Sequence, residues 1–247
     1  MENNVLISGA ISVKAALECG KRSVLEVYAD ENKITKSKDF GYIRALCRDR
    51  NIPFSVKDGE FFSKEDFGST HGGIGALVGE MRTEDEDALL EAENPFIVLL
   101  DGIEDPFNFG CAIRTLYAAG ATGIVLPERN WLSASGTVLR SSAGASERIP
   151  CAVTSDIPSF ILKAKEKGIT VLAADRRDAV PLYSERLDMP VLLLVGGEKR
   201  GISSEILKLA DKRIYIPYGR EFRNALSASS AVSVFAFEIY RQRNSDQ

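Results

Sequence analysis

Five short, mostly apolar runs in the second half of the chain predict the strands of a parallel sheet. They are FIVLL at 96–100, GIVL at 123–126, TVLAA at 170–174, VLLLV at 191–195 and RIYI at 213–216. Runs of this length, bounded by turn residues, are typical of strands that are buried on both faces. Helical patterns separate them, at 109–119, around Val138, from about Ser159, at 203–210 and at 232–243. Regular alternation of strand and helix predicts an α/β fold, with a mostly parallel sheet covered by helices on both faces.

The first 80 residues form a shorter series of the same kind. Helical and strand patterns succeed one another in SVKAALECG, VLEVYAD, FGYIRALCRDRN, IPFSVKD and GIGALVGE. We therefore expect a small α/β domain at 1–80, an acidic linker at 81–94 and a larger α/β domain at 95–247.

Composition narrows the class of protein. A chain of 247 residues with 45% hydrophobic content can bury one large or two modest cores. No run approaches the ~18 apolar residues of a membrane span, and the start MENNVLISGA does not resemble a secretion signal, so we expect a cytoplasmic protein without a membrane partner. The four cysteines are scattered, which predicts reduced, mostly buried thiols. With His71 as the single histidine, neither Ser-His-Asp catalysis nor a metal site is expected.

The net charge of −4 disfavours a nucleic-acid partner until its distribution is considered. The segment 83–94, TEDEDALLEAEN, carries six acids and no base, so without it the net charge becomes +2. That segment is expected to be a linker or a solvated helix. Bases in the first 80 residues are candidates for an RNA-facing surface: Lys21, Arg22, Lys33, Lys36, Lys38, Arg44, Arg48 and Arg50. A solvated face without a partner is an equal alternative, because Lys and Arg are mostly at surfaces anyway.

The stretch DGIEDPFNFGCAIRTLYAAG, which follows the first apolar run, has an unusual composition for a core helix. Pro106 suits a turn or the first position of a helix, and Asn108 can accept bonds from free backbone N–H groups. A helix at about 109–119 would turn its apolar positions Ile113, Leu116, Tyr117 and Ala118 to the sheet. Arg114 would be displaced toward the strand ends, where α/β sheets bind ligands.

Two later loops follow predicted strands in the same way. In LLLVGGEKRGIS, Gly196 and Gly197 would let a ligand approach the backbone closely, and Glu198 stands at the exit of the strand. In IPYGREFRNALSASSA, small residues open a helix. Each loop alone is a weak signal, since a GG pair after a strand is usually only a tight turn. Neither a GxGxxG nor a Walker loop is present, which disfavours a nucleotide-binding Rossmann enzyme.

Taken together and in order, these motifs resemble those of the SpoU/TrmH branch of the SPOUT RNA methyltransferases. The series is D-x-x-x-D-P-x-N-x-G-x-x-x-R-T, S-A-G, V-G-G-E-K-x-G-I-S, I-P and L-S-A-S-S-A, before a helix that ends in RQR. The resemblance implies a catalytic domain with a trefoil knot, a homodimer formed through that domain, and a site completed across the interface. The small domain, with its motif at Gly9 to Leu17 and HGGIGALV, resembles a ribosomal-protein-like substrate domain.

The activity implied is methyl transfer from S-adenosylmethionine to a ribose 2′-hydroxyl of structured RNA, with rRNA expected before tRNA. The implied cofactor-binding residues are Gly196, Gly197, Ile216, Pro217, Leu226 and Ser227. The implied catalytic residues are Arg114, Asn108 and Glu198. Because a guanidinium stays protonated, Arg114 is better suited to bind the target phosphate, which leaves Glu198 as a candidate proton acceptor.

The third motif departs from the family pattern. Where members usually have S-L-N-V-S, this chain has ALSAS at 225–229, and one extra residue lies between Gly219 and Leu226. Asn224 or Ser227 could supply the missing hydrogen bonds. An RNA-binding or ribosome-assembly factor that has lost turnover is therefore the rival function. Retention of Asn108, Arg114 and Glu198 favours the enzyme.

Overall fold

The computed structural model describes residues 4–34, 38–65, 67, 71–128 and 135–245. The chain divides into two compact units. Unit 1 comprises Met1–Arg82 and Asn130–Arg148, and unit 2 comprises Thr83–Arg129 and Ile149–Gln247. The helix expected around Val138 exists as α6 (Ser135–Ser141), and together with η2 (Ala145–Glu147) it belongs to unit 1.

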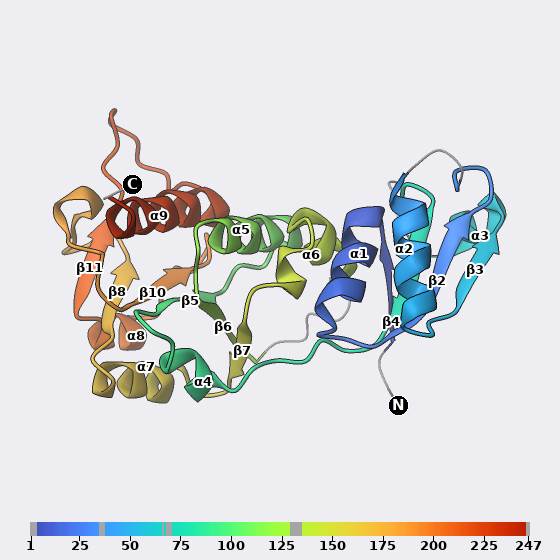
Figure 1. Ribbon diagram of the computed structural model, residues 1–247. Helices are drawn as coiled ribbons and strands as arrows, with labels where there is room; N and C mark the ends of the chain where they lie inside the picture. Colours follow the sequence, from blue (N-terminus) through green and yellow to red (C-terminus); the bar gives the residue numbers. More distant parts are fainter. Residues whose placement is uncertain (1–3, 35–37, 66, 68–70, 129–134, 246–247) are drawn as a thin grey trace. The chain divides into compact units, whose positions relative to one another are not determined.

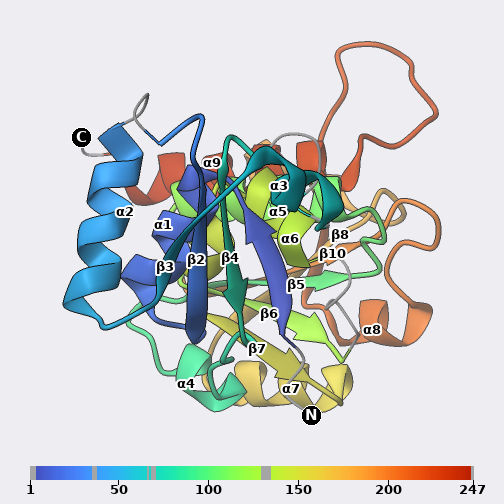
Figure 2. The ribbon, with the colours of Figure 1, turned by 90° about the vertical axis from the view of Figure 1, so that its right-hand side faces the viewer.

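Unit 1 contains a four-stranded sheet in the order β1-β4-β2-β3 (Figure 2). The strands are β1 (Val5–Ser8), β2 (Val24–Asp30), β3 (Phe54–Lys57) and β4 (Ile74–Val78), and only the β2–β3 pair is parallel. Helices α1 (Ala10–Cys19) and α2 (Lys38–Asp49) pack on one face around Val27 and Ala29. On the other face Tyr28 packs against Phe62 of α3 (Gly59–Lys64) and against Phe67.

A buried ion pair attaches the 130–148 segment to the rest of unit 1. Arg22 and Glu147, which are 125 positions apart, form a two-pronged contact with N–O distances of 2.6 and 3.1 Å. Leu139 of α6 enters the same core as α1 and α2. Because a buried charge that loses its partner is costly, neither segment of unit 1 is expected to be stable without the other.

The pair also corrects one sequence expectation. Arg22 was expected on an RNA-facing surface, but it is buried and neutralised by Glu147. Among the other bases, Arg50 donates to the Leu17 carbonyl, while Arg44 and Arg48 are exposed. Lys36 and the side chain of Lys38 lie outside the described part of the structure.

Unit 2 is a parallel sheet of seven strands in the order β7-β6-β5-β10-β8-β11-β9, and every described strand pair is parallel. The strands are β5 (Phe96–Asp101), β6 (Gly123–Pro127), β7 (Cys151–Thr154), β8 (Thr170–Ala174), β9 (Val180–Pro181), β10 (Val191–Gly196) and β11 (Lys212–Tyr215). The α/β prediction is confirmed for this unit, and the five apolar runs are β5, β6, β8, β10 and β11.

Helices cover both faces of this sheet (Figure 1). On one face lie α5 (Pro106–Ala118) and α9 (Ala228–Arg243), and on the other α4 (Glu86–Leu90), α7 (Ile157–Glu166) and α8 (Ser204–Leu209). A short turn, η3 (Leu182–Ser184), follows β9. Ile113 and Leu116 of α5 are buried as expected, whereas Tyr117 and Ala118 are exposed, which corrects that part of the prediction. These two residues lie 100° and 200° beyond Leu116 around the helix, and thus outside its buried stripe.

The acidic segment is an integral part of unit 2. Leu89 and Leu90 of α4 enter the core beneath the sheet. Lys163 of α7 donates hydrogen bonds to Asp87 and Glu86 at 3.0 and 3.1 Å, and these bonds raise the pKa of the lysine. A third acid of the segment, Glu91, pairs with Lys167 at 3.1 Å. Lys163 of α7 and Lys167, the residue that caps its end, explain why so acidic a stretch packs onto the unit.

The RQR end of α9 joins the helix to the starts of the central strands. The guanidinium of Arg243 donates to three main-chain carbonyls, those of Asn94 (2.8 Å), Pro95 (3.0 Å) and Met189 (2.6 Å). It also lies over the ring of Phe96, 5.7 Å from its centroid. Arg243 thus stabilises the strand entrances of β5 and β10.

The cysteine thiols are reduced, and two of the four are buried. All four cysteines are free, and Cys47 and Cys151 are buried, although Cys111 is exposed. Burial raises the pKa of the Cys47 thiol to about 11, so that it stays protonated at neutral pH. Within the described residues no helix has the length and apolarity to cross a membrane, and no three His, Cys, Asp or Glu side chains gather as a metal site would require.

Candidate functional site

The two central strands of unit 2 bring two of the predicted loops together. β5 and β10 pair in parallel with Gly196 opposite Asp101, so residues 102–105 and 197–203 leave the sheet side by side. The loops are in close contact. A Cβ at Gly197 would lie 1.8 Å from the carbonyl oxygen of Gly102, and one at Gly196 would lie 2.3 Å from the carbonyl carbon of Gly201. Both positions therefore require glycine for contact between backbones, before any ligand is considered.

Asp105 and Asn108 have different roles at the start of α5. The helix begins at Pro106, and the Asp105 carboxylate caps it by accepting from the Asn108 backbone N–H at 2.7 Å. Asn108 was expected to provide such a cap with its own side chain. Because Asp105 caps the helix, the Asn108 amide is available for contacts with other loops.

Asn108 and Glu198 join the three loops into one hydrogen-bonded group, here called the Asn108–Glu198 cluster. The Asn108 amide donates to Glu198 Oε1 at 3.1 Å and accepts from the Ser229 hydroxyl at 3.2 Å. Glu198 Oε1 also accepts from the backbone N–H of Ala228 at 3.1 Å. The cluster thus connects the start of α5, the loop after β10 and the first turn of α9.

Ser227 is the N-cap of α9, in the position where the related pattern usually has Asn. Its hydroxyl accepts from the backbone N–H of Ser230 at 3.2 Å and lies 3.1 Å from the Ser229 hydroxyl. The altered third motif therefore still caps the N-terminus of α9, and through Ser229 it still forms a hydrogen bond with Asn108. Further along, Ser233 of α9 meets Thr115 of α5 at 3.3 Å, so that small side chains let the two helices approach closely.

A pocket of about 290 Å³ opens at the carboxyl ends of β8, β10 and β11. Its volume is close to the ~300 Å³ at which small-molecule sites begin. Predicted residues in its lining are Gly196, Gly197, Glu198, Ile216 and Leu226. Pro217 and Ser227 do not line it. A smaller pocket of about 120 Å³, lined by Gly102, Glu104, Asn108 and Lys199, shares Glu198 with the first.

Sequence reasoning missed part of this lining: Asp175, Arg176, Arg177 and Tyr218. The signal was available for the first three, because DRR directly follows the TVLAA strand and so reaches the same sheet edge as the predicted loops. Tyr218 stands within the third loop, and its hydroxyl accepts from the backbone N–H of Leu226 at 3.2 Å.

Arg114 is exposed on α5 and lies apart from the Asn108–Glu198 cluster. It is six residues from Asn108, about 9 Å along the helix and on a different face. Among the described residues its side chain has no hydrogen-bond or ion-pair partner. The acids that could have neutralised it are otherwise engaged, since Glu104 pairs with Lys199 at 2.7 Å and Asp105 caps the helix. A structural ion pair with either acid is therefore not its role here.

Comparison with known proteins decides the family. The sequence model of the SpoU rRNA Methylase family matches residues 95–237. An uncharacterized tRNA/rRNA methyltransferase of Archaeoglobus fulgidus is 34% identical over 235 residues, which cover 94% of this chain and 96% of that protein. The chain belongs to the SpoU family of RNA methyltransferases.

Solved structures of SpoU proteins agree with the fold. The SpoU methyltransferase AviRb of Streptomyces viridochromogenes, solved in complex with the cofactor AdoMet, superposes with a TM-score of 0.81 at 25% identity, covering 98% of this chain and 92% of that chain. An RNA 2′-O ribose methyltransferase superposes with a TM-score of 0.79 at 21% identity, with coverages of 98% and 90%. The similarity extends through both units of this SpoU protein.

Proposed function

We propose that this SpoU protein transfers a methyl group from S-adenosylmethionine to a ribose 2′-hydroxyl of RNA, with rRNA as the first candidate substrate. The observation that supports this most is the meeting of three loops at one sheet edge. The Asn108–Glu198 cluster joins them beside a pocket whose lining includes Gly196, Ile216 and Leu226.

The lining of the pocket suits the chemistry of the proposed cofactor. Ile216, Leu226 and Phe235 offer apolar walls, and Gly196 and Gly197 expose main-chain surface without side chains. Such a site suits a ligand that combines a nucleoside with an amino-acid chain. When bound, S-adenosylmethionine supplies an electrophilic methyl group on a positively charged sulfur.

The remaining chemistry falls to this chain's own side chains. A ribose hydroxyl is a weak nucleophile and needs its proton removed or shared as it attacks. Glu198 stands at the pocket wall with one oxygen, Oε1, held by Asn108 and Ala228, which leaves Oε2 as the proton acceptor. Arg114, with an exposed guanidinium, would bind the phosphate of the reacting nucleotide bidentately.

Arg114 and Glu198 would meet in a dimer rather than within one chain. The exposed face of α5 that carries Arg114 also carries Phe107 (61% exposed), and the adjacent α9 exposes Phe237 (48%) and Tyr240 (43%). Large aromatic side chains on two neighbouring helices are typical of an interface. A second copy packed on this surface would bring its own Arg114 to the cluster of the first.

Coexpression of two inactive variants tests the shared site. If Arg114 acts across the interface, heterodimers of Arg114→Ala and Glu198→Ala chains retain one intact site, and random pairing should restore about a quarter of the wild-type rate. If both residues act within one chain, every site lacks one of them and activity stays absent. Light scattering on the wild-type protein measures its mass in solution and shows whether it is a dimer.

Unit 1 is proposed as the RNA-selecting, ribosomal-protein-like domain, and unit 2 as a knotted SPOUT domain. Deleting residues 1–80 would remove both Arg22, the partner of Glu147, and the core that Leu139 enters, so point substitutions test unit 1 better. Replacing the exposed Arg44 and Arg48 with Ala should weaken RNA binding and spare cofactor binding. Unchanged RNA affinity would assign unit 1 another task.

The substrate is best identified in cells. Mapping 2′-O-methyl positions in total RNA with and without the gene should show a position that is lost in its absence, in rRNA under this proposal. Loss of a methylated position in tRNA instead would identify tRNA as the substrate. An unchanged methylation map, combined with a ribosome-assembly defect, would support the rival function of a binding factor without turnover.

A further inference from the structure

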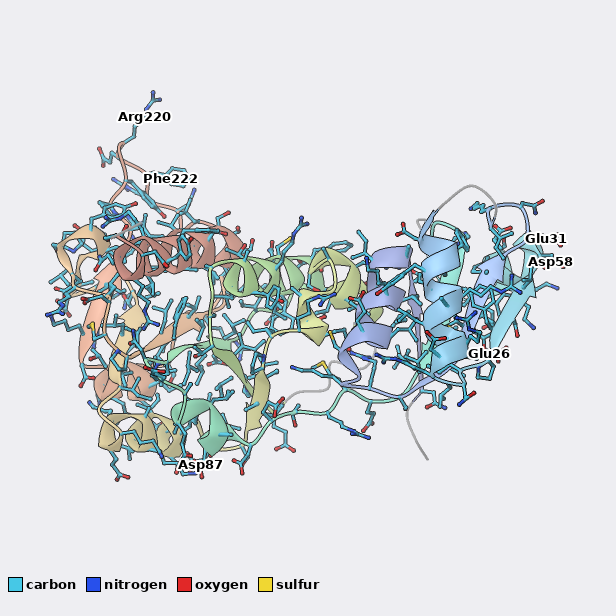
Figure 3. All side chains as sticks on the ribbon, viewed as in Figure 1. Glu26, Glu31, Asp58, Asp87, Arg220 and Phe222 are labelled. Atoms are coloured by element: carbon cyan, nitrogen blue, oxygen red, sulfur yellow. The ribbon has the colours of Figure 1, made fainter. Side chains whose placement is uncertain are left out.

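The loop between β11 and α9 has an exposed stretch of seven consecutive residues, 219–225, with the sequence GREFRNA. It extends away from unit 2, with Arg220 at its outer end and Phe222 on its returning limb (Figure 3). This 219–225 loop contains the additional residue of the third motif. Its base is part of the pocket, because Tyr218 on one side and Ala225 and Leu226 on the other line it.

Arg176 holds the loop in this conformation. Its guanidinium donates to the carbonyls of Phe222 and Arg223, each at 3.3 Å, and lies 4.8 Å above the ring of Tyr218. Tyr218 in turn accepts the Leu226 backbone N–H. Arg176 itself lines the pocket, so the loop and the pocket share one wall.

The side chains presented by the loop are of the kind that binds single-stranded nucleic acid. Phe222 is 49% exposed, and its ring is 6.1 Å from that of Tyr218. Arg223 follows it directly and Arg220 precedes it by two positions, and within the described structure neither guanidinium has a partner. An exposed aromatic ring with two free guanidinium groups on the same loop offers a stacking surface for a base and contacts for neighbouring phosphates.

We propose that the 219–225 loop binds an unpaired RNA segment next to the reacting nucleotide, with Phe222 stacked on a base and Arg220 and Arg223 on phosphates. The inference rests on the proposed function, since it assigns the RNA contact of the same site. It adds that the target lies in a single-stranded region, because only an unstacked base is available to Phe222. Arg176 is a positioning residue that keeps the loop beside the pocket.

Binding of a labelled short oligouridylate to the full-length protein tests the loop, with an RNA duplex of equal length as comparison. Phe222→Ala should weaken binding of the single strand about tenfold and of the duplex much less. Arg220→Ala and Arg223→Ala should each reduce the slope of log affinity against log salt by about one, as expected when one phosphate contact is lost. Tyr183→Ala and Lys208→Ala, which remove an exposed ring and an exposed charge elsewhere on unit 2, are the matched controls and should change neither quantity.

Calorimetry with S-adenosylmethionine keeps this inference separate from the proposed function. If the wild type neither binds the cofactor nor methylates RNA, the proposed function fails. If it does both, and Phe222→Ala binds the single strand as tightly as wild type, the loop inference alone is wrong. A lower mass of Phe222→Ala in light scattering would place the loop in a protein interface and also overturn it.

Arg176 provides a second readout. Arg176→Ala should weaken both cofactor and oligouridylate binding, because the loop and the pocket share its contacts. Arg176→Lys should rescue little, since an ammonium cannot span both carbonyls while stacking on Tyr218. Full rescue by Lys, or an Ala variant unchanged in both affinities, would contradict the positioning role.

Discussion

Gly197→Ala is the substitution whose effect can be worked out most directly from the structure. The new Cβ would stand 1.8 Å from the carbonyl oxygen of Gly102, about 1.2 Å inside the closest approach that such atoms make. Both contacting groups are backbone, so no side chain can rotate away. Either the loop after β5 or the loop after β10 must retreat.

The expected cost follows from this overlap. Overpacking of a well-packed site typically costs about 1–3 kcal/mol, and for a chain of this size about 2–4 °C of Tm accompanies each kcal/mol. We therefore expect a fall in Tm of about 2–12 °C. Retreat of the loop should also distort the Asn108–Glu198 cluster and weaken S-adenosylmethionine binding about tenfold or more.

A matched control is available in the same unit. A Cβ at Gly219 would meet nothing within 4 Å, and its φ is not positive, so Gly219→Ala should leave Tm and cofactor affinity almost unchanged. Melting curves and calorimetric titrations on the two variants and the wild type provide the comparison. If Gly197→Ala melts and binds like the wild type, the close contact of the two loops is not a feature of the protein in solution.

Further predictions concern single side chains. Arg114→Ala should keep the wild-type melting curve and cofactor affinity but reduce single-turnover methyl transfer by a factor of about 100 or more, with little rescue by Lys; full activity would refute its role. Glu198→Gln keeps an oxygen for both donors of the cluster, so it should retain cofactor binding and lose transfer, whereas normal turnover would show that Glu198 only positions other groups. Arg243→Ala removes bonds to three carbonyls and should lower unfolding stability by about 2–4 kcal/mol, measured by denaturant titration. Hydrogen bonds from Arg241 lower the pKa of Glu238, so its contribution to stability should be present above its unfolded pKa near 4.5 and be lost as the pH falls through its lower folded value; a Glu238→Gln variant with the same Tm–pH profile as wild type would contradict this.

Local patterns in the sequence were sufficient to predict the architecture of unit 2. The apolar runs are long enough to mark strands buried on both faces, and their alternation with helices leaves little choice but a parallel sheet. The convergence of Gly196, Glu198 and Asn108 also followed, because loops at the carboxyl ends of parallel strands share one edge. The start of α5 was misplaced by three residues, since either Asp105 or Asn108 could have capped it.

Contacts between residues far apart in the sequence could not be predicted from local patterns. Nothing near Arg22 indicates that it pairs with Glu147, and so the membership of 130–148 in unit 1 was not predicted. The contact of Arg176 with the 219–225 loop is of the same kind, because its carbonyl partners lie 46 and 47 positions away, although its place at the sheet edge follows from the strand before it. Such contacts depend on tertiary packing, which has no local periodicity.

The atom of the RNA that receives the methyl group decides whether the protein is a ribose 2′-O-methyltransferase. Full-length protein is incubated with S-adenosylmethionine labelled in its methyl group and with total RNA from cells that lack the gene, and the RNA is then hydrolysed with alkali. A methylated 2′-hydroxyl blocks cleavage of the neighbouring phosphodiester, so the label is expected in alkali-resistant dinucleotides. Label in mononucleotides, as base methylation would give, or no incorporation at all, would contradict it.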